Sequence, residues 1–105
     1  MRKDAAPKLS PEAAIAELRR IIDELKTELR GLESKIVAEQ QRMAGPEARV
    51  MRAIRDGNDR LARDSLLDLQ GSAESLAALR AEITVVREMI TECEAFLVEH
   101  ANGRA

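Results

Sequence analysis

The chain has 105 residues, a net charge of −2, 34% charged residues and a single aromatic residue, Phe96. Such a chain forms at most one domain, and it lacks the large rings from which a compact core normally takes much of its buried area. The charge gives no general attraction to nucleic acid, one cysteine excludes an intrachain disulfide, and no apolar run approaches the roughly 18 residues that a membrane-spanning helix needs. We therefore expect a cytoplasmic protein, with a peripheral position at the inner membrane left open.

The first arm of the fold is expected over about residues 11–56, after a polar and flexible N-terminal tail at residues 1–9. Ser10 can cap a helix and Pro11 suits the first helical position. Apolar side chains then recur at alternating steps of three and four residues, which is the spacing of a coiled-coil seam. These seam residues are Leu18, Ile22, Leu25, Leu29, Leu32 and Ile36, followed by Glu39 as a defect and then Met43.

The second arm, about residues 59–101, repeats this spacing, and Asn102 with Gly103 predicts its end before a tail at residues 103–105. Its main seam residues are Leu76, Leu79, Ile83, Val86, Ile90, Cys93 and Leu97. Two heptad segments on one chain predict an antiparallel hairpin, in which the numbers of facing residues have a constant sum. With a sum of 115, Leu25 faces Ile90, and nearer the turn Val50 faces Ser65 and Ile54 faces Leu61.

The implied reversal lies at the centre of the chain, and its turn residues are Gly57, Asn58 and Asp59. Glycine can take the left-handed conformation that ends one helix, and Asn58 or Asp59 can cap the next. A competing turn at residues 44–46, or a three-helix arrangement broken there, stays open.

The expected fold class is therefore all-α, a long antiparallel α-helical hairpin over residues 10–102. With the turn at Gly57, Pro46 lies inside the first helix and should kink it. Gly71 lies at the same height on the second helix and could leave room for the kink.

Charged and apolar residues outside the seam suggest contact surfaces. Residues 49–63 have a net charge of +3 and residues 74–99 a net charge of −4. Solvated helix faces would explain both charges, whereas a sharper hypothesis is a basic tip that contacts the acidic arm of another copy or an anionic lipid. Apolar residues beside the seam lead us to expect dimerisation into a four-helix assembly. The candidate partner-binding residues are Arg49, Arg52, Arg55, Arg60, Arg63, Met89 and Phe96, with Val85 and Leu67 further round the second helix.

No pattern for catalysis, a metal or a cofactor is found. Cys93 and His100 are seven residues apart, about two helical turns, which is too far for them to share a metal. There is no phosphate-binding loop, nucleophile elbow or zinc signature. We expect no enzyme activity, no cofactor and no small-molecule substrate. Nucleic acid is not an expected partner either, because the arginines lack a DNA-binding frame and RNA-stacking aromatics are missing.

Residues 47–66 resemble the helical-hairpin region of the phage-shock protein A family, which includes the vesicle-inducing proteins of plastids. The family's run is Ala, three variable residues, Gly, three polar residues and then Leu-Ala-Arg-x-x-Leu. It is matched here by Ala53, Gly57, Leu61, Ala62, Arg63 and Leu66. The resemblance implies a long hairpin, self-assembly and action at stressed bacterial membranes, and some members restrain an ATPase transcription activator.

Three departures from the family limit what the resemblance implies. Only residues 1–9 precede the first arm, where the family has a lipid-binding amphipathic helix, and the family's later helices have no counterpart before Ala105. Pro46 stands where the family often has Trp. Membrane binding and full polymerisation are therefore not carried over.

The leading functional hypothesis is a non-enzymatic hairpin scaffold or adaptor of the phage-shock type, which acts through self-association and protein partners. We expect a homo-oligomer with a protein partner, and peripheral contact with anionic membrane stays open. The alternative is a secretion or assembly chaperone with the shape of the hairpin stalk proteins, whose seam opens to hold a partner helix. A purely structural oligomerisation module is the third hypothesis.

Overall fold

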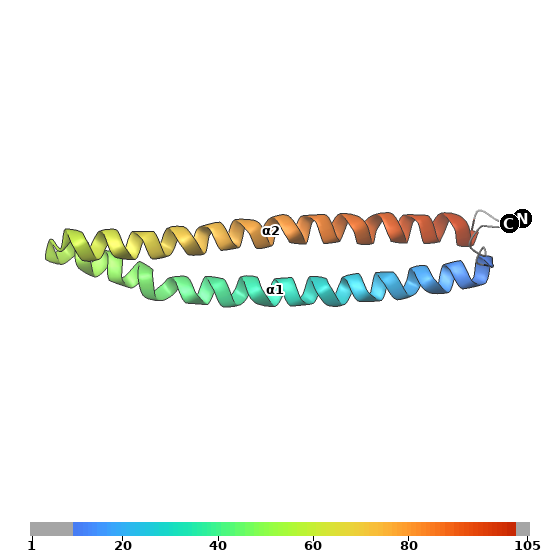
Figure 1. The fold of residues 1–105 in the computed structure, drawn as a ribbon, viewed down its shortest axis with the longest axis horizontal. Helices are drawn as coiled ribbons and strands as arrows, with labels where there is room; N and C mark the ends of the chain where they lie inside the picture. Colours follow the sequence, from blue (N-terminus) through green and yellow to red (C-terminus); the bar gives the residue numbers. More distant parts are fainter. Residues whose placement is uncertain (1–9, 103–105) are drawn as a thin grey trace, which may run out of the picture.

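The computed structural model describes residues 10–102, which form two long α-helices and no strand. Helix α1 spans Pro11–Asp56 and helix α2 spans Asp59–Asn102. The helices run antiparallel as a hairpin, so that α1 begins and α2 ends at one end of the rod (Figure 1). We call this the open end, and the other the turn end. At 1.5 Å per residue the 46 residues of α1 are roughly 69 Å long. The tails expected at residues 1–9 and 103–105 lie outside the described residues.

Helix α1 begins where the sequence supplies a cap. Ser10 has an extended backbone conformation, with φ −64° and ψ 158°, and its hydroxyl oxygen accepts a hydrogen bond from the N–H of Ala13 at 3.1 Å. Pro11 follows at the first helical position, where its missing N–H removes no helical hydrogen bond. The start of the helix is thus determined locally.

The reversal between the helices uses only two residues. Gly57 is left-handed, with φ 69° and ψ 23°, and its N–H donates to the carbonyl oxygen of Ile54 at 3.2 Å while that of Asn58 donates to Ala53 at 2.8 Å. These two bonds satisfy the last carbonyls of α1. Asn58 also caps α2, because its side-chain oxygen accepts from the N–H of Leu61 at 3.1 Å. One residue therefore closes the first helix and opens the second.

We expect Gly57→Ala to lower the free energy of unfolding by about 1 kcal/mol, because a Cβ is unfavourable in the left-handed conformation. Gly71→Ala is the matched control. Gly71 is exposed within α2, and an added Cβ would meet nothing within 4 Å, so this change should stabilise the helix by up to about 1 kcal/mol. Chemical unfolding of both variants checks the prediction, and shifts of the same sign would contradict it.

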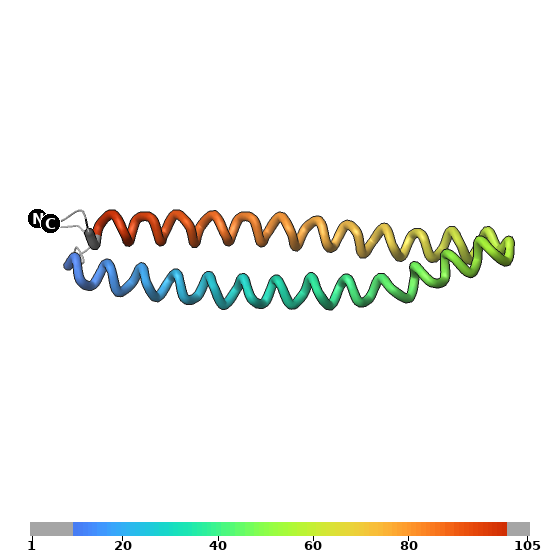
Figure 2. The backbone as a smooth tube through the Cα atoms, turned by 180° about the vertical axis from the view of Figure 1, so that it is seen from behind, coloured from blue at the N-terminus to red at the C-terminus, as the bar shows by residue number. Residues whose placement is uncertain are grey.

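Helix α1 continues through residues 44–46, so the competing turn and the three-helix arrangement are wrong. Instead the helix bends toward α2 in its green segment (Figures 1 and 2). Pro46 explains the bend, because proline lacks the N–H of a helical hydrogen bond and its ring crowds the preceding turn. The expectation that Gly71 makes room for the bend is also wrong, because an added Cβ there would meet nothing.

The core is a single strip between the helices. Seven seam residues are buried, and the strip is one layer deep because each helix contributes only one apolar stripe. The buried seam residues are Ile22, Leu25, Leu32, Leu76, Ile83, Val86 and Ile90. The half-buried ones are Leu18, Leu29, Ile36, Leu79, Cys93 and Leu97.

Near the turn the seam is built from small residues. Ala53 and Ser65 are each only 1% exposed, the lowest values among the residues assigned to the core. In both views the two helices overlap close to the turn but lie side by side elsewhere (Figures 1 and 2). Small side chains leave room for the two backbones to lie close to each other in the seam, and the overlap shows that the plane of the two helices turns here.

One expected seam contact near the turn is wrong. Ile54, expected to face Leu61 across the seam, is 64% exposed. After Met43, steps of three, four and three residues lead instead to Pro46, Val50 and Ala53. Pro46 is half-buried, and Val50 and Ala53 are buried. Ile54 is one residue further on, so it points out of the seam.

Candidate interaction surface

Two ion pairs between the helices define one side of the hairpin, which we call the ion-paired flank. Lys26 Nζ lies 3.2 Å from Glu94 Oε2, and Arg87 Nη2 lies 3.1 Å from Glu33 Oε2. In an antiparallel hairpin, pairs in equivalent positions have the same sum of residue numbers. The sum is 120 for both ion pairs and 115 for facing seam residues, so both ion pairs lie on the same side of the seam. All four residues are exposed. These pairs therefore add little to stability, but they make this stretch of surface polar.

Among residues 10–102, the opposite flank has its one ion pair between the helices toward the turn, where Arg49 Nη2 lies 3.4 Å from Asp68 Oδ2. At the open end it is apolar. A hollow there is lined by Pro11, Ala14, Ile15, Leu18, Phe96, Leu97 and His100. Val85, Met89 and Phe96 form one stripe of α2 on this flank, spaced four and seven residues apart, and are 43–54% exposed. We call these three residues the open-end patch.

Acidic side chains border the open-end patch. By helical spacing, Glu92 lies between Met89 and Phe96 on the same face of α2. Both helices contribute exposed glutamates to this border: Glu17, Glu24, Glu28, Glu82, Glu92 and Glu99. The open-end patch is therefore an apolar stripe within an acidic rim.

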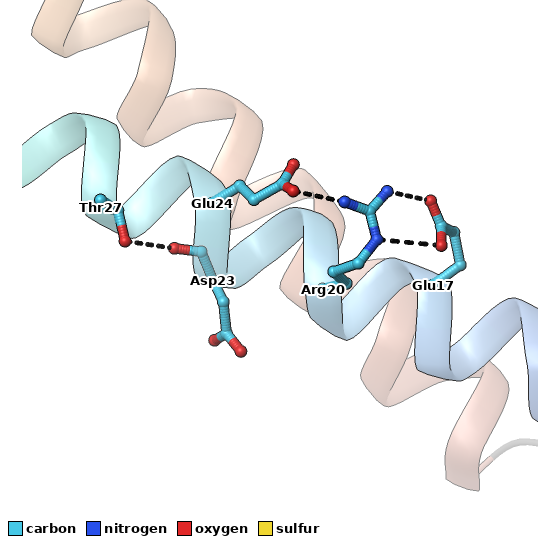
Figure 3. Close-up of polar contacts among 5 residues, drawn as sticks. All are labelled: Glu17, Arg20, Asp23, Glu24 and Thr27. Carbon is cyan, nitrogen blue, oxygen red and sulfur yellow. Dashed lines mark hydrogen bonds and ion pairs between the residues drawn. The ribbon is translucent and has the colours of Figure 1, made fainter.

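Arg20 lies beside two of these glutamates. Arg20 donates hydrogen bonds to both Glu17 and Glu24, while Thr27 donates to the carbonyl oxygen of Asp23 at 3.1 Å on the same helix (Figure 3). The hydrogen bond from Arg20 holds the pKa of Glu17 below its ordinary value, and the same bond raises the pKa of Arg20. Both side chains are exposed, so water screens the pair. The rim stays acidic, because one arginine is shared by two carboxylates.

We expect Arg20→Gln to raise the pKa of Glu17 toward its ordinary value, as an NMR pH titration of its carboxyl carbon would show. Because the folded-state pKa is depressed, the small stabilisation from this pair is present above the unfolded-state pKa and is lost as pH falls through the folded-state pKa. Lys26→Gln is the control, because Lys26 pairs with Glu94 and not with Glu17. An unchanged pKa in Arg20→Gln would contradict the assignment.

A second apolar surface lies at the turn end, and we call it the turn patch. It consists of Met51, Ile54, Leu66 and Leu67, each more than half exposed. The numbers of Ile54 and Leu66 add to 120, as those of the two interhelical ion pairs do, so this patch continues the ion-paired flank. The same end of the rod carries four exposed arginines: Arg52, Arg55, Arg60 and Arg63.

The candidate partner-binding residues thus form two separate surfaces. Four of the five arginines are exposed at the turn end, whereas Arg49 is half-buried and paired with Asp68. Met89 and Phe96 lie at the open end. Sequence reasoning missed the turn patch, because Ile54 was assigned to the seam. Following the regular spacing through Pro46 would have found it.

The remaining candidate groups show no reactive arrangement. His100 stacks on Phe96 with ring centroids 3.8 Å apart, and Cys93 is a half-buried seam residue with a free thiol. Between residues 10 and 102, no group of three or more His, Cys, Asp or Glu side chains could hold a metal ion. Over the same residues, neither helix contains a stretch apolar enough for its length to cross a bilayer.

The fold defines the chain as an antiparallel α-helical hairpin with an apolar patch at each end. Comparisons with protein-family models, with curated proteins and with solved structures found no match. Any functional conclusion therefore depends on the surfaces of the hairpin itself.

Proposed function

We propose that the chain is a non-enzymatic coiled-coil hairpin scaffold or adaptor of the phage-shock type, which acts through self-association and protein partners. One observation supports this most directly. Seven of the nine exposed large hydrophobic residues of the described chain lie in the open-end patch or the turn patch, and Val37 and Val98 lie outside both. Surfaces of this kind, apolar in the middle and charged around the rim, are the usual anatomy of a protein contact site.

The thinness of the core gives the physical reason for association. A two-helix seam is one layer deep, so side chains beside it stay in water in the single hairpin. Covering apolar surface gains about 25 cal/mol per Å². A second chain can cover Met89, Phe96 and Ile54 without disturbing the seam.

Sedimentation equilibrium of the full chain over a wide concentration range tests the proposal. We expect a dimer or a larger assembly, and we expect Phe96→Gln to shift the equilibrium toward monomer. Glu88→Gln is a control, because Glu88 is an exposed polar residue on the outer side of the same helix. A phage-shock type of action further predicts that the protein sediments with anionic vesicles and that added salt releases it. The protein should not sediment with neutral vesicles. A monomer at all concentrations that binds neither vesicles nor protein would contradict the proposal.

The apolar hollow at the open end favours a second candidate function, a secretion or assembly chaperone. Side chains from both helices line the hollow, among them Leu18 and Phe96, so an apolar side chain of a partner helix could insert there. Such a protein stays soluble with vesicles and co-purifies with one defined protein, and Leu18→Gln abolishes that complex. An oligomer that binds neither vesicles nor a partner protein would indicate the third function, a purely structural oligomerisation module.

A further inference from the structure

We infer that two copies of this chain pair antiparallel, with the turn patch of each copy on the open-end patch of the other. The inference rests on the self-association proposed above and adds its orientation and its contact residues. Both patches are apolar and of similar size, with three or four large side chains each. They lie toward opposite ends of the rod, so a pair of copies can form both contacts at once only when the two copies are antiparallel.

Charge selects this pairing over contacts between like patches. The open-end patch has a rim of glutamates such as Glu92, with Arg20 as the cation shared by two of them. The turn patch lies at the same end of the rod as four exposed arginines, and residues 49–63 carry a net charge of +3. Two open-end patches in contact would bring acidic rims together, which is unfavourable, whereas opposite patches attract.

The middle of the rod argues against a four-helix bundle along the whole length. The ion-paired flank carries the Glu33–Arg87 pair there. The opposite flank carries exposed Lys35 and Arg42 between the two patches. Burying these charges costs more than their pairing returns, so the contacts are confined to the two ends.

The winding of the hairpin brings the two patches toward one side. The patches lie on opposite flanks, but the plane of the two helices turns as it approaches the turn end (Figures 1 and 2). Winding at the usual pitch of roughly 140–210 Å rotates the flanks by roughly 70–100° over the roughly 40 Å between the patches. Two rods that wind round each other can then form both contacts at once, because the spacing between patches is the same in each copy.

Single-cysteine variants test which patches meet. Leu66→Cys in the turn patch and Met89→Cys in the open-end patch are each made in a Cys93→Ala background, since Cys93 is the native thiol. We expect a mixture of the two to form a disulfide-linked heterodimer on mild oxidation, because thiols join only where their Cα atoms approach within about 7 Å. The matched control replaces Met89→Cys with Thr91→Cys, an exposed site on the ion-paired side of the same helix, and its yield should be several-fold lower.

A charge exchange provides a second test that needs no cysteine. Glu92→Lys and Arg63→Glu should each weaken dimerisation by about tenfold, and the two together in one chain should restore it. Self-linking of Met89→Cys alone or Leu66→Cys alone, or a mass that rises beyond a dimer, would overturn the inferred pairing while leaving self-association intact. A monomer would overturn both. A monomer that sediments with anionic vesicles would show that lipid, and not a second copy, covers the patches.

Discussion

Leu32→Ala is expected to lower the free energy of unfolding by about 3 kcal/mol, the largest effect among single substitutions considered for this chain. Leu32 is 5% exposed and belongs to the buried cluster with Leu25, Ile83, Val86 and Ile90. The strip has no second layer to close over the cavity, so the lost contacts are not replaced. Urea unfolding followed by circular dichroism measures the change, at one protein concentration because association adds to apparent stability.

Val37→Ala is the control for Leu32→Ala. Val37 lies one and a half turns further along α1 and is about half exposed, so its truncation should change stability by less than about 0.5 kcal/mol. Similar losses from both variants would mean that the helices do not meet along the strip described here.

Ala53→Leu is expected to cost about 2 kcal/mol, although it adds apolar volume to the seam. Ala53 is buried in the seam near the turn, and Ser65 on α2 is equally buried. Three added carbon atoms have no space there, so the helices must separate or the side chain must leave a favourable rotamer. Thermal unfolding measures the loss.

Ala48→Leu is the matched control for Ala53→Leu. Ala48 lies on the exposed side of α1, just over one turn before Ala53, and leucine is nearly as good a helix former as alanine. Its effect should stay within about 0.5 kcal/mol. A neutral Ala53→Leu would show that the small residues near the turn do not set the distance between the helices.

These two predictions concern two parts of the seam that are built from side chains of different size. Along most of the rod, large aliphatic side chains hold the helices apart and provide the stability. Near the turn, beyond the bend at Pro46, the small residues Ala53 and Ser65 are buried in the seam instead. The exposed apolar side chains lie beside this strip at both ends, so contact surfaces can change without loss of the core.

Much of this architecture is readable from the chain alone, because its signals are local. The helix start depends on Ser10 and Pro11, and the reversal depends on Gly57 and Asn58, each within a few residues of the hydrogen bonds that it makes. The steps of three and four residues identify the stripe that each helix buries, because helical periodicity alone places those side chains on one face.

Other features depend on how the two helices meet in space. A proline after a glycine is compatible with a turn or with a bend, and in the structure α1 stays helical through Pro46, which is half-buried. The spacing between the helices put Ala53 in the seam and left Ile54 in water. Which flank is polar and which is apolar follows from pairs far apart in the sequence, such as Glu33 with Arg87. Such pairs exist only once register and separation are set, and no short stretch of sequence contains that information.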